Sequence, residues 1–365
     1  MTALSSIKKI HQRFKLNGTS YNDGQLKELA YSFIKEGQAY EQEIGAFMLD
    51  WLDQRDTIAV KTSGSTGTPK KILLRKQHMI NSARATADFF GLKAGSSALL
   101  CLPAQYIAGK MMLVRAFVSG LELDCVVPSA TPLAATQKIY DFCAMVPLQL
   151  ENSLHNIEKL KKLLVGGAPM ALQLKNQVQL SSTQIYETYG MTETITHVAV
   201  NHINSKKTLG PSGVESIFTA LPNVHFEKDN RDCLVITAPK VSENPVITND
   251  IVNLISETQF EWLGRIDNVI NSGGIKLFPE QIEAKLSELI SNRFFVIGLF
   301  DKNLGQKLVL IVEGKINIEL LTKEIAALSS LGEYEVPKTI YNLPKFLETE
   351  TGKILRNENL QLIKS

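Results

Sequence analysis

The sequence has few cysteines, no long apolar run and almost no net charge. Its four cysteines form no CxxC pair, which is typical of buried thiols in a reducing compartment. No stretch of eighteen apolar residues suggests a membrane-spanning helix, and the first fourteen residues lack the apolar segment of a secretory signal. The net charge of +2 and the absence of a Lys/Arg run argue against nucleic acid as a partner. We therefore expect a cytoplasmic protein without stable membrane insertion; association with a membrane surface or with further copies of the chain stays open.

The composition is that of a globular protein, with 44% hydrophobic and 21% charged residues, and 365 residues suffice for two or three domains. Short apolar runs alternate with helical spacings, a pattern that favours α/β layers with a mainly parallel sheet. The pattern predicts helices over residues 24–53, 76–90, 133–145 and 157–162, and strands over 57–62, 72–74, 98–102, 122–127, 162–165 and 234–237.

The pattern changes after residue 265. Helices are expected over residues 279–289 and 318–328, and strands over 294–299, 308–312 and 339–342. About a hundred residues of this kind make a normal small domain. We predict domains at 1–264 and 265–365.

A Gly/Ser/Thr-rich loop is the strongest local signal. The run TSGSTGTPK lies between two expected strands, and its two glycines let backbone N–H groups approach an anion closely. Taken alone, such a loop is more often a flexible hairpin turn, and it is not a Walker A motif. The candidate phosphate-binding residues are Thr62, Ser63, Gly64, Ser65, Thr66, Gly67 and Lys70.

The loop resembles the phosphate loop of the adenylate-forming superfamily, which includes the acyl-CoA synthetases. Four further segments resemble the same superfamily in the same order: YETYGMTET at 186–194, TND at 248–250, WLGRIDNVI with SGG at 262–274, and TGKILR at 351–356. The resemblance implies an α/β fold: a large N-terminal domain of layered mixed or parallel sheets with helices, and a small mobile α+β C-terminal domain.

The resemblance also implies roles for single residues. Tyr189 and Gly190 would border the adenine, Thr192 would contact phosphate, and Glu193 would hold Mg²⁺, which prefers carboxylate oxygen. Asp250 would accept hydrogen bonds from the ribose hydroxyls, as an acceptor-only group can. Taken singly, a glutamate or aspartate of this kind is more often a solvated turn residue.

Further roles follow from the later motifs. Arg265 would touch the ribose, Asp267 would be the hinge, and Gly273 and Gly274 would lie near a thiol channel. Lys353 would be the catalytic lysine that offsets charge in the transition state. The alternative for Lys353 is an exposed turn lysine.

The implied chemistry uses ATP, Mg²⁺ and coenzyme A. A carboxylic acid attacks ATP to give an acyl-AMP, and a thiol then takes the acyl group and releases AMP. Rotation of the small domain about Asp267 would separate the two steps.

The acid is suggested by a narrower resemblance. The phosphate loop begins early in this chain, as in the shortened o-succinylbenzoate–CoA ligases of menaquinone synthesis. The run LPAQYIAG followed by Arg115 resembles their LPLFHxSG…R, with Tyr106 where His is usual, and VPLQL resembles their VPTQL. Arg115 is the candidate for a second carboxylate, a surface or structural role being the alternative. The remaining candidates for the acid pocket are Tyr106, Gly109, Gly166, Gly167 and Ala168.

Three alternatives stay open: a CoA ligase for another aromatic or short-chain acid, an adenylation enzyme that loads a carrier protein, and an inactive nucleotide-binding module.

Overall fold

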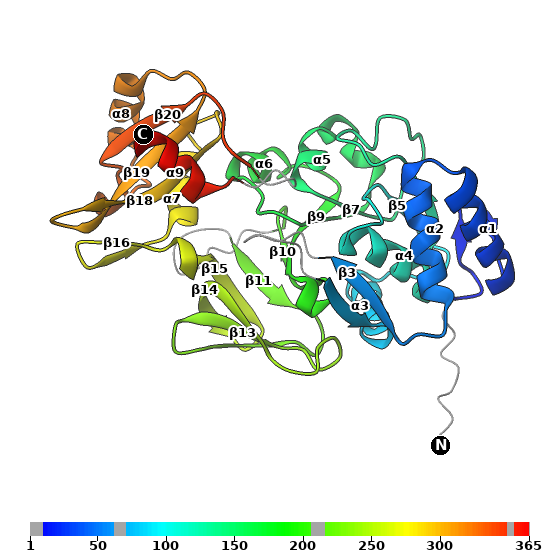
Figure 1. Cartoon of the computed structure of the whole chain (residues 1–365). Helices are drawn as coiled ribbons and strands as arrows, with labels where there is room; N and C mark the ends of the chain where they lie inside the picture. Colours follow the sequence, from blue (N-terminus) through cyan, green and yellow to red (C-terminus); the bar gives the residue numbers. More distant parts are fainter. Residues whose placement is uncertain (1–9, 62–70, 206–215, 349–353, 365) are drawn as a thin grey trace.

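The computed structural model describes residues 10–61, 71–205, 216–348 and 354–364, and the fold is set out from these parts of the chain. Figure 1 shows a large unit built around a long sheet and a smaller C-terminal unit beside it. No helix of the described parts combines the length and the apolar character needed to cross a membrane.

The large unit is organised by a sheet of thirteen strands among the described residues. Neighbouring strands pair in parallel from β1 through β6, β5, β7 and β8 to β9, and antiparallel from β9 onward. The sheet is therefore mixed rather than mainly parallel. In spatial order the strands are β12 (His225–Lys228), β13 (Cys233–Thr237), β14 (Val246–Ser256), β15 (Gln259–Arg265), β11 (Ile217–Ala220), β10 (His197–His202), β9 (Gln184–Gly190), β8 (Lys162–Val165), β7 (Phe142–Met145), β5 (Ser97–Leu100), β6 (Glu122–Cys125), β1 (Lys15–Leu16) and β2 (Thr19–Ser20).

The central strands are buried on both faces, so they appear in the sequence as continuous apolar runs. Along β7, Phe142 and Ala144 join one buried cluster, while Cys143 and Met145 join another. Successive side chains of a strand point to opposite faces, so these two clusters lie on the two sides of the sheet. The central part is thus a helix–sheet–helix sandwich (Figure 1).

Identifiable residues mark where the helices begin and end. Asn22 caps the first helix by accepting a hydrogen bond from Gln25 N at 2.9 Å. Gly91 ends the third with φ +62°, the left-handed conformation that glycine adopts readily. The helices are α1 (Asp23–Glu36), α2 (Ala39–Leu52), α3 (Lys76–Phe90), α4 (Ile107–Ser119), α5 (Pro147–Glu151) and α6 (Leu172–Gln177).

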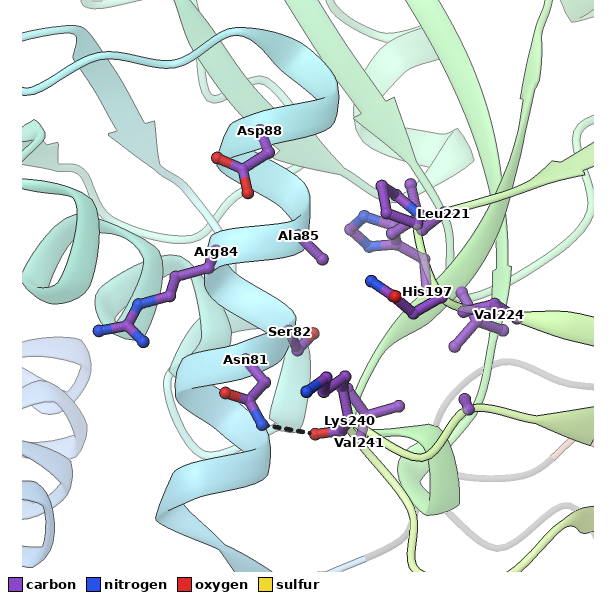
Figure 2. A pocket seen from close by; sticks show the side chains of 14 residues that line it. Asn81, Ser82, Arg84, Ala85, Asp88, His197, Leu221, Val224, Lys240 and Val241 are labelled. Atoms are coloured by element: carbon purple, nitrogen blue, oxygen red, sulfur yellow. Dashed lines mark hydrogen bonds between the residues drawn. The ribbon is translucent and has the colours of Figure 1, made fainter.

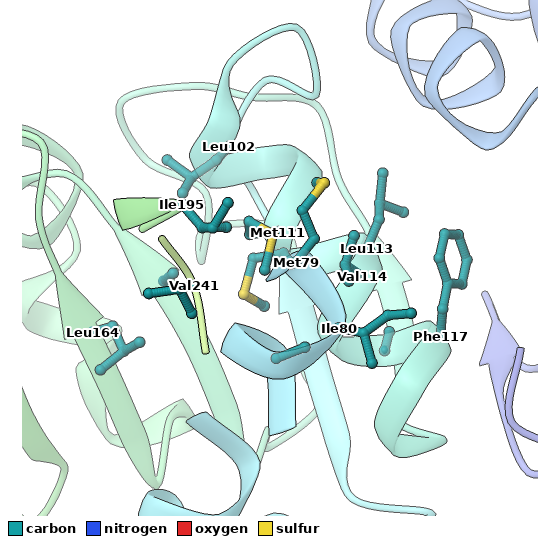
Figure 3. Close-up of a cluster of buried hydrophobic side chains, with 14 of the residues drawn as sticks. Met79, Ile80, Leu102, Met111, Leu113, Val114, Phe117, Leu164, Ile195 and Val241 are labelled. Carbon is teal, nitrogen blue, oxygen red and sulfur yellow. The ribbon is translucent and has the colours of Figure 1, made fainter. Parts of the chain in front are cut away.

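Helices α3 and α4 pack together on one face of the sheet. Figure 3 shows Met79 and Ile80 of α3 beside Met111, Leu113 and Val114 of α4. All five side chains are at most 3% exposed. This packing holds α3, another face of which lines the cavity described below.

The helix expected over residues 133–145 is wrong. Residues 142–145 form strand β7 instead, because a short apolar run fits a doubly buried strand as well as a helix. The helix expected over 157–162 is also incorrect: a 3₁₀ turn at Leu154–Lys159 precedes β8. The segment expected as helical over 24–53 is two helices, α1 and α2, separated at Gly37 and Gln38.

Among the residues that the structure describes, the C-terminal unit has its own five-stranded sheet and its own buried clusters. This organisation supports the predicted division at residues 264 and 265, which stays a prediction. The strands are β16 (Ile270–Ser272), β17 (Ile275–Leu277), β18 (Phe294–Asp301), β19 (Gly305–Glu313) and β20 (Thr339–Leu343), and the helices are α7 (Pro279–Leu286), α8 (Ile318–Ala327) and α9 (Arg356–Lys364).

Candidate functional site

The two strands predicted to flank the phosphate loop are present. β3 (Thr57–Lys61) and β4 (Lys71–Arg75) pair antiparallel, with Lys61 opposite Lys71. The predicted loop residues Thr62, Ser63, Gly64, Ser65, Thr66, Gly67 and Lys70 lie outside the described residues, as does Lys353.

Tyr189 and Asp250 are in direct contact. The Tyr189 hydroxyl donates to Asp250 Oδ2 at 2.7 Å, and the Trp262 indole N–H donates to Oδ1 at 3.2 Å. Both carboxylate oxygens are therefore held, and Asp250 is only 8% exposed. Burial and the negative charge of Asp250 raise the pKa of Tyr189 well above its usual range. Tyr189 is thus a neutral donor that orients the carboxylate.

Arg265 lies directly opposite Asp250 across the β14–β15 pair. Its guanidinium donates to Asp267 Oδ2 at 2.7 Å, and Asn249 donates to the same oxygen at 3.4 Å. The hydrogen bond from Arg265 lowers the pKa of Asp267, which is therefore ionised at neutral pH. The predicted ribose contacts and the predicted hinge residue thus form one polar group.

The segment after β9 is tightly constrained. A Cβ on Gly190 would lie 2.1 Å from the carbonyl oxygen of Thr196, so only glycine fits there. Thr192 and Glu193 follow in a short 3₁₀ turn (Thr192–Thr194). Glu193 is exposed and makes no hydrogen bond or ion pair with the described residues.

The single carboxylate of Glu193 suits Mg²⁺ that is bound together with substrate phosphates. The described residues contain no group of three or more His, Cys, Asp or Glu that could hold a metal. Mg²⁺ is commonly bound by one or two carboxylates together with substrate phosphates. A single carboxylate such as that of Glu193 fits this mode.

Arg115 is buried, with its side chain among neutral groups. It is 2% exposed, and its guanidinium donates to Thr196 Oγ1 at 3.2 Å, Thr86 Oγ1 at 3.4 Å and His197 Nδ1 at 3.4 Å. No carboxylate of the described residues bonds to it. Burial lowers the pKa of Arg115 to about 10. Arg115 is therefore a buried cation that no described acid neutralises, and the alternative of a surface arginine is wrong.

His197 is the neutral partner of Arg115. Burial and the charge of Arg115 lower the pKa of His197 well below its usual range. Because a guanidinium only donates, Nδ1 must accept, and the proton on Nε2 then points to Thr86 Oγ1 at 3.4 Å. Ile195, just before this pair, has φ +67°, a strained conformation for a β-branched residue. That turn places the backbone of Thr196 and His197 against Gly190.

A cavity of about 200 Å³ lies beside this cluster, between α3 and the start of β10. Figure 2 shows Ser82 on the helix side and His197 on the strand side, with Lys240 nearby. Asn81 donates to the carbonyl oxygen of Lys240 at 2.8 Å and ties the helix to the β13–β14 connection. Arg115 does not line the cavity, but its partner His197 and Ser82, which contacts Thr196 at 3.4 Å, do.

Two predicted acid-pocket residues begin helix α4. Tyr106 precedes the helix and is 41% exposed. Gly109 packs against the preceding backbone, since a Cβ there would lie 2.2 Å from the Pro103 carbonyl oxygen. This close packing is reason enough for a glycine at position 109, and a contact of Gly109 with the acid stays a prediction.

The predicted pocket floor, Gly166, Gly167 and Ala168, follows strand β8. Parallel strands carry binding residues at their carboxyl ends, where this loop begins. Gly167 has φ +84°, which only glycine adopts easily. Gly273 and Gly274, in contrast, form an exposed turn between β16 and β17 with φ +58° and +86°, within the C-terminal unit.

Three residues of this arrangement escape prediction from the sequence. Trp262 lies in one of the recognised motifs, yet nothing in the pattern shows that its N–H reaches Asp250. His197 is fixed by Arg115 of α4 and Thr86 of α3, which lie far from it in sequence. Glu187 of β9 is fixed by the backbone N–H of Met170 and by Lys175 of α6. The proximity of His197 to the YGMTE motif is the one signal that the sequence offers.

A family model described as AMP-binding enzyme matches residues 13–227, more than half of the chain. The chain therefore belongs to the AMP-binding enzyme family. A solved structure from Dyadobacter fermentans, described as an acyl-CoA synthetase (AMP-forming)/AMP-acid ligase II-like protein, is 36% identical. The match covers 92% of this chain and 98% of that one, with a TM-score of 0.60.

More distant relatives carry a specific name. The 2-succinylbenzoate–CoA ligase of Bacillus cytotoxicus is 25% identical, over 83% of this chain and 69% of its own. The same enzyme of Haemophilus influenzae is also 25% identical, over 88% and 74%. The o-succinylbenzoate CoA synthetase of Bacillus subtilis, solved with its acyl-adenylate intermediate, shares the fold at TM-score 0.70 and 21% identity, over 82% of this chain and 68% of that one.

Proposed function

We propose that this protein is an AMP-forming acid–thiol ligase that converts o-succinylbenzoate to its coenzyme A thioester through an acyl-AMP. The observation that carries the reaction class is the Asp250 carboxylate held by Tyr189 and Trp262, with Arg265 opposite it, in a member of the AMP-binding family. Such a carboxylate is preset to accept hydrogen bonds from a ribose diol.

The nucleotide would lie across the end of β9. Tyr189 and Gly190 would border the adenine, and Thr192 would meet the α-phosphate. Mg²⁺, held by Glu193 and the phosphates, would neutralise charge on the leaving pyrophosphate. By family resemblance, the loop 62–70 would hold the β- and γ-phosphates and Lys353 would stabilise the reacting centre.

The second half-reaction would use the C-terminal unit. The thiolate of coenzyme A attacks the acyl carbonyl carbon and forms the thioester. The bond between that carbon and the phosphate oxygen breaks, and AMP leaves with the oxygen. The family pattern assigns the hinge to Asp267 and the thiol channel to Gly273 and Gly274. Arg265 ends β15 of the large sheet, so its ion pair with Asp267 would have to rearrange if the chain beyond it turns about Asp267.

The choice of acid rests on Arg115 and on the relatives' names. A buried guanidinium is costly unless an anion compensates it, and the described residues supply none. A substrate with a second carboxylate would supply that anion. The relatives named 2-succinylbenzoate–CoA ligase support this acid. The nearby cavity is lined by His197, the hydrogen-bond partner of Arg115, and not by Arg115 itself. Tyr106 replaces the usual His at the start of α4 and would border the acid.

The test is a reaction of the purified protein with ATP, Mg²⁺, coenzyme A and a panel of acids, followed by mass spectrometry of AMP and thioester. The panel should pair o-succinylbenzoate with benzoate and short-chain acids, which lack the second carboxylate. Thioester from o-succinylbenzoate in preference to these acids supports the proposal. Thioester from another acid alone keeps the reaction and overturns the substrate. AMP without thioester favours loading of a carrier protein, and no AMP with any acid favours an inactive nucleotide-binding module.

A further inference from the structure

Glu187, on strand β9, anchors the loop that follows strand β8. Its Oε1 accepts a hydrogen bond from the backbone N–H of Met170 at 2.8 Å, and its Oε2 accepts one from Lys175 Nζ at 2.6 Å. The side chains of Glu187 and Lys175 are 6% and 14% exposed. One buried carboxylate therefore binds both the end of the loop 166–170 and the helix α6 behind it.

The neighbouring residue, Thr188, holds the start of the same loop. Its hydroxyl donates to the carbonyl oxygen of Val165 at 3.1 Å, and a Cβ on Gly166 would lie 2.3 Å from that hydroxyl. Strands β8 and β9 are paired in parallel with Val165 opposite Glu187. Thus Thr188 fixes the start of the loop at the end of β8, and Glu187 fixes the end of the loop at Met170.

The same strand also carries the nucleotide side of the site. Tyr189, which orients Asp250, is two residues beyond Glu187, about 7 Å along an extended strand. A loop anchored to β9 is therefore held at a fixed distance from the Tyr189–Asp250 pair. For a reaction that joins an acid to a nucleotide phosphate, misplacement by an ångström costs much of the rate.

We propose that Glu187 is a positioning residue for the acid substrate: it sets the Gly166–Ala168 floor relative to the nucleotide through Met170 and Lys175. This inference rests on the proposed function, because it takes that loop as the floor of the acid pocket. A buried ion pair of this kind need not stabilise the fold overall, which is consistent with a role in fixing one loop conformation.

The experiment compares Glu187→Leu, Glu187→Gln and Lys175→Met with a matched control, Glu335→Leu. Glu335 also accepts from one lysine, Lys285 at 2.6 Å, and from one backbone N–H, that of Gly332 at 2.7 Å, but it lies in the C-terminal unit. For each variant, KM and kcat are measured separately for the acid and for ATP. Hydrogen exchange of the peptide containing Met170 reports the anchor without any need for activity.

Glu187→Leu should raise KM for the acid roughly tenfold or more and leave KM for ATP within about twofold, with faster exchange at Met170. Glu187→Gln should fall between wild type and Glu187→Leu, because an amide oxygen still accepts from Met170. The control should change neither KM. If the wild type is active but Glu187→Leu changes KM for the acid and KM for ATP equally, or changes neither, this inference alone is overturned. A wild type inactive with every acid overturns the proposed function and this inference with it.

Discussion

The Tyr189 hydroxyl donates a 2.7 Å hydrogen bond to Asp250, 61 positions further along the chain. Strand β9 supplies the tyrosine and β14 the aspartate, with β10, β11 and β15 between them in the sheet. The bond therefore depends on the mixed sheet curving so that these strands approach each other. The indole N–H of Trp262, on β15, donates a hydrogen bond to the second carboxylate oxygen of Asp250.

Removal of the tyrosine hydroxyl should weaken nucleotide binding. Tyr189→Phe leaves the ring packed against Phe218 and Phe260 and deletes only the donor. A hydrogen bond to a charged group contributes about 1.5–3 kcal/mol, so KM for ATP should rise about tenfold or more. ATP–pyrophosphate exchange measures this. Tyr186→Phe, which removes a weak exposed contact to Gln184, is the control; equal effects of the two variants would contradict the role of Asp250.

Replacement of Arg115 separates a binding role from a structural one. Because no described acid neutralises its charge, Arg115→Met should not lower the free energy of unfolding by more than about 1 kcal/mol. It should reduce kcat/KM for o-succinylbenzoate about a hundredfold, while activation of benzoate changes little. Arg115→Lys keeps the charge and should lose less. Unfolding of Arg115→Met at much lower urea concentration, with an equal loss for both acids, would point to a structural role.

Acid should destabilise the protein through His197. Its pKa is depressed in the folded state, so the stability linked to it is present above about pH 6.5 and is lost as the pH falls, because the unfolded chain takes up the proton. The loss should reach up to about 1.4 kcal/mol per pH unit. His197→Gln should remove this slope in urea titrations, while the exposed His155→Gln should retain it. A slope unchanged by His197→Gln would show that His197 is protonated in the folded state.

The pair of Asp53 and the buried Lys76 should stabilise the large unit. The carboxylate lies 2.7 Å from the Lys76 amine. Burial tends to raise the pKa of Asp53, but hydrogen bonds from Lys76 and Arg55 outweigh it and lower the pKa to about 2. Asp53→Asn should therefore cost about 2 kcal/mol at neutral pH, and the cost should vanish as the pH falls from about 4 through 2. Asp50→Asn, at an exposed ion pair with Arg55, should cost less than about 1 kcal/mol.

Much of the fold could be predicted from local pattern, and the failures have physical causes. Helix α3 begins and ends where the sequence predicts, because its apolar stripe and the Gly91 terminator are local signals. Strand β7 escapes prediction because Phe142–Met145 is apolar on both faces, which erases the alternation that identifies a strand. In the antiparallel half of the sheet, shifts of register interrupt the β13–β14 and β14–β15 pairs, so the alternation that would reveal these strands in the sequence is broken.

The candidate site divides in the same way. Tyr189, Asp250 and Arg265 lie in motifs that the sequence displays, and the fold brings them together. The bond from Trp262 to Asp250 depends on the pairing of β14 with β15. The bonds of Glu187 depend on the packing of Met170 and helix α6 against β9. No local window of sequence contains either arrangement. Burial of Arg115 against His197 depends on the turn at Ile195, whose positive φ could not be expected of a β-branched residue.

The most direct test traps the intermediate. The protein is mixed with ATP, Mg²⁺ and o-succinylbenzoate without coenzyme A, and the quenched reaction is examined by mass spectrometry for the mixed anhydride of the acid with AMP. The proposed function predicts one acyl-AMP per active site at most, formed with release of pyrophosphate and converted to thioester and AMP when coenzyme A is added. Absence of the acyl-AMP, or an acyl-AMP that coenzyme A does not consume, would contradict it.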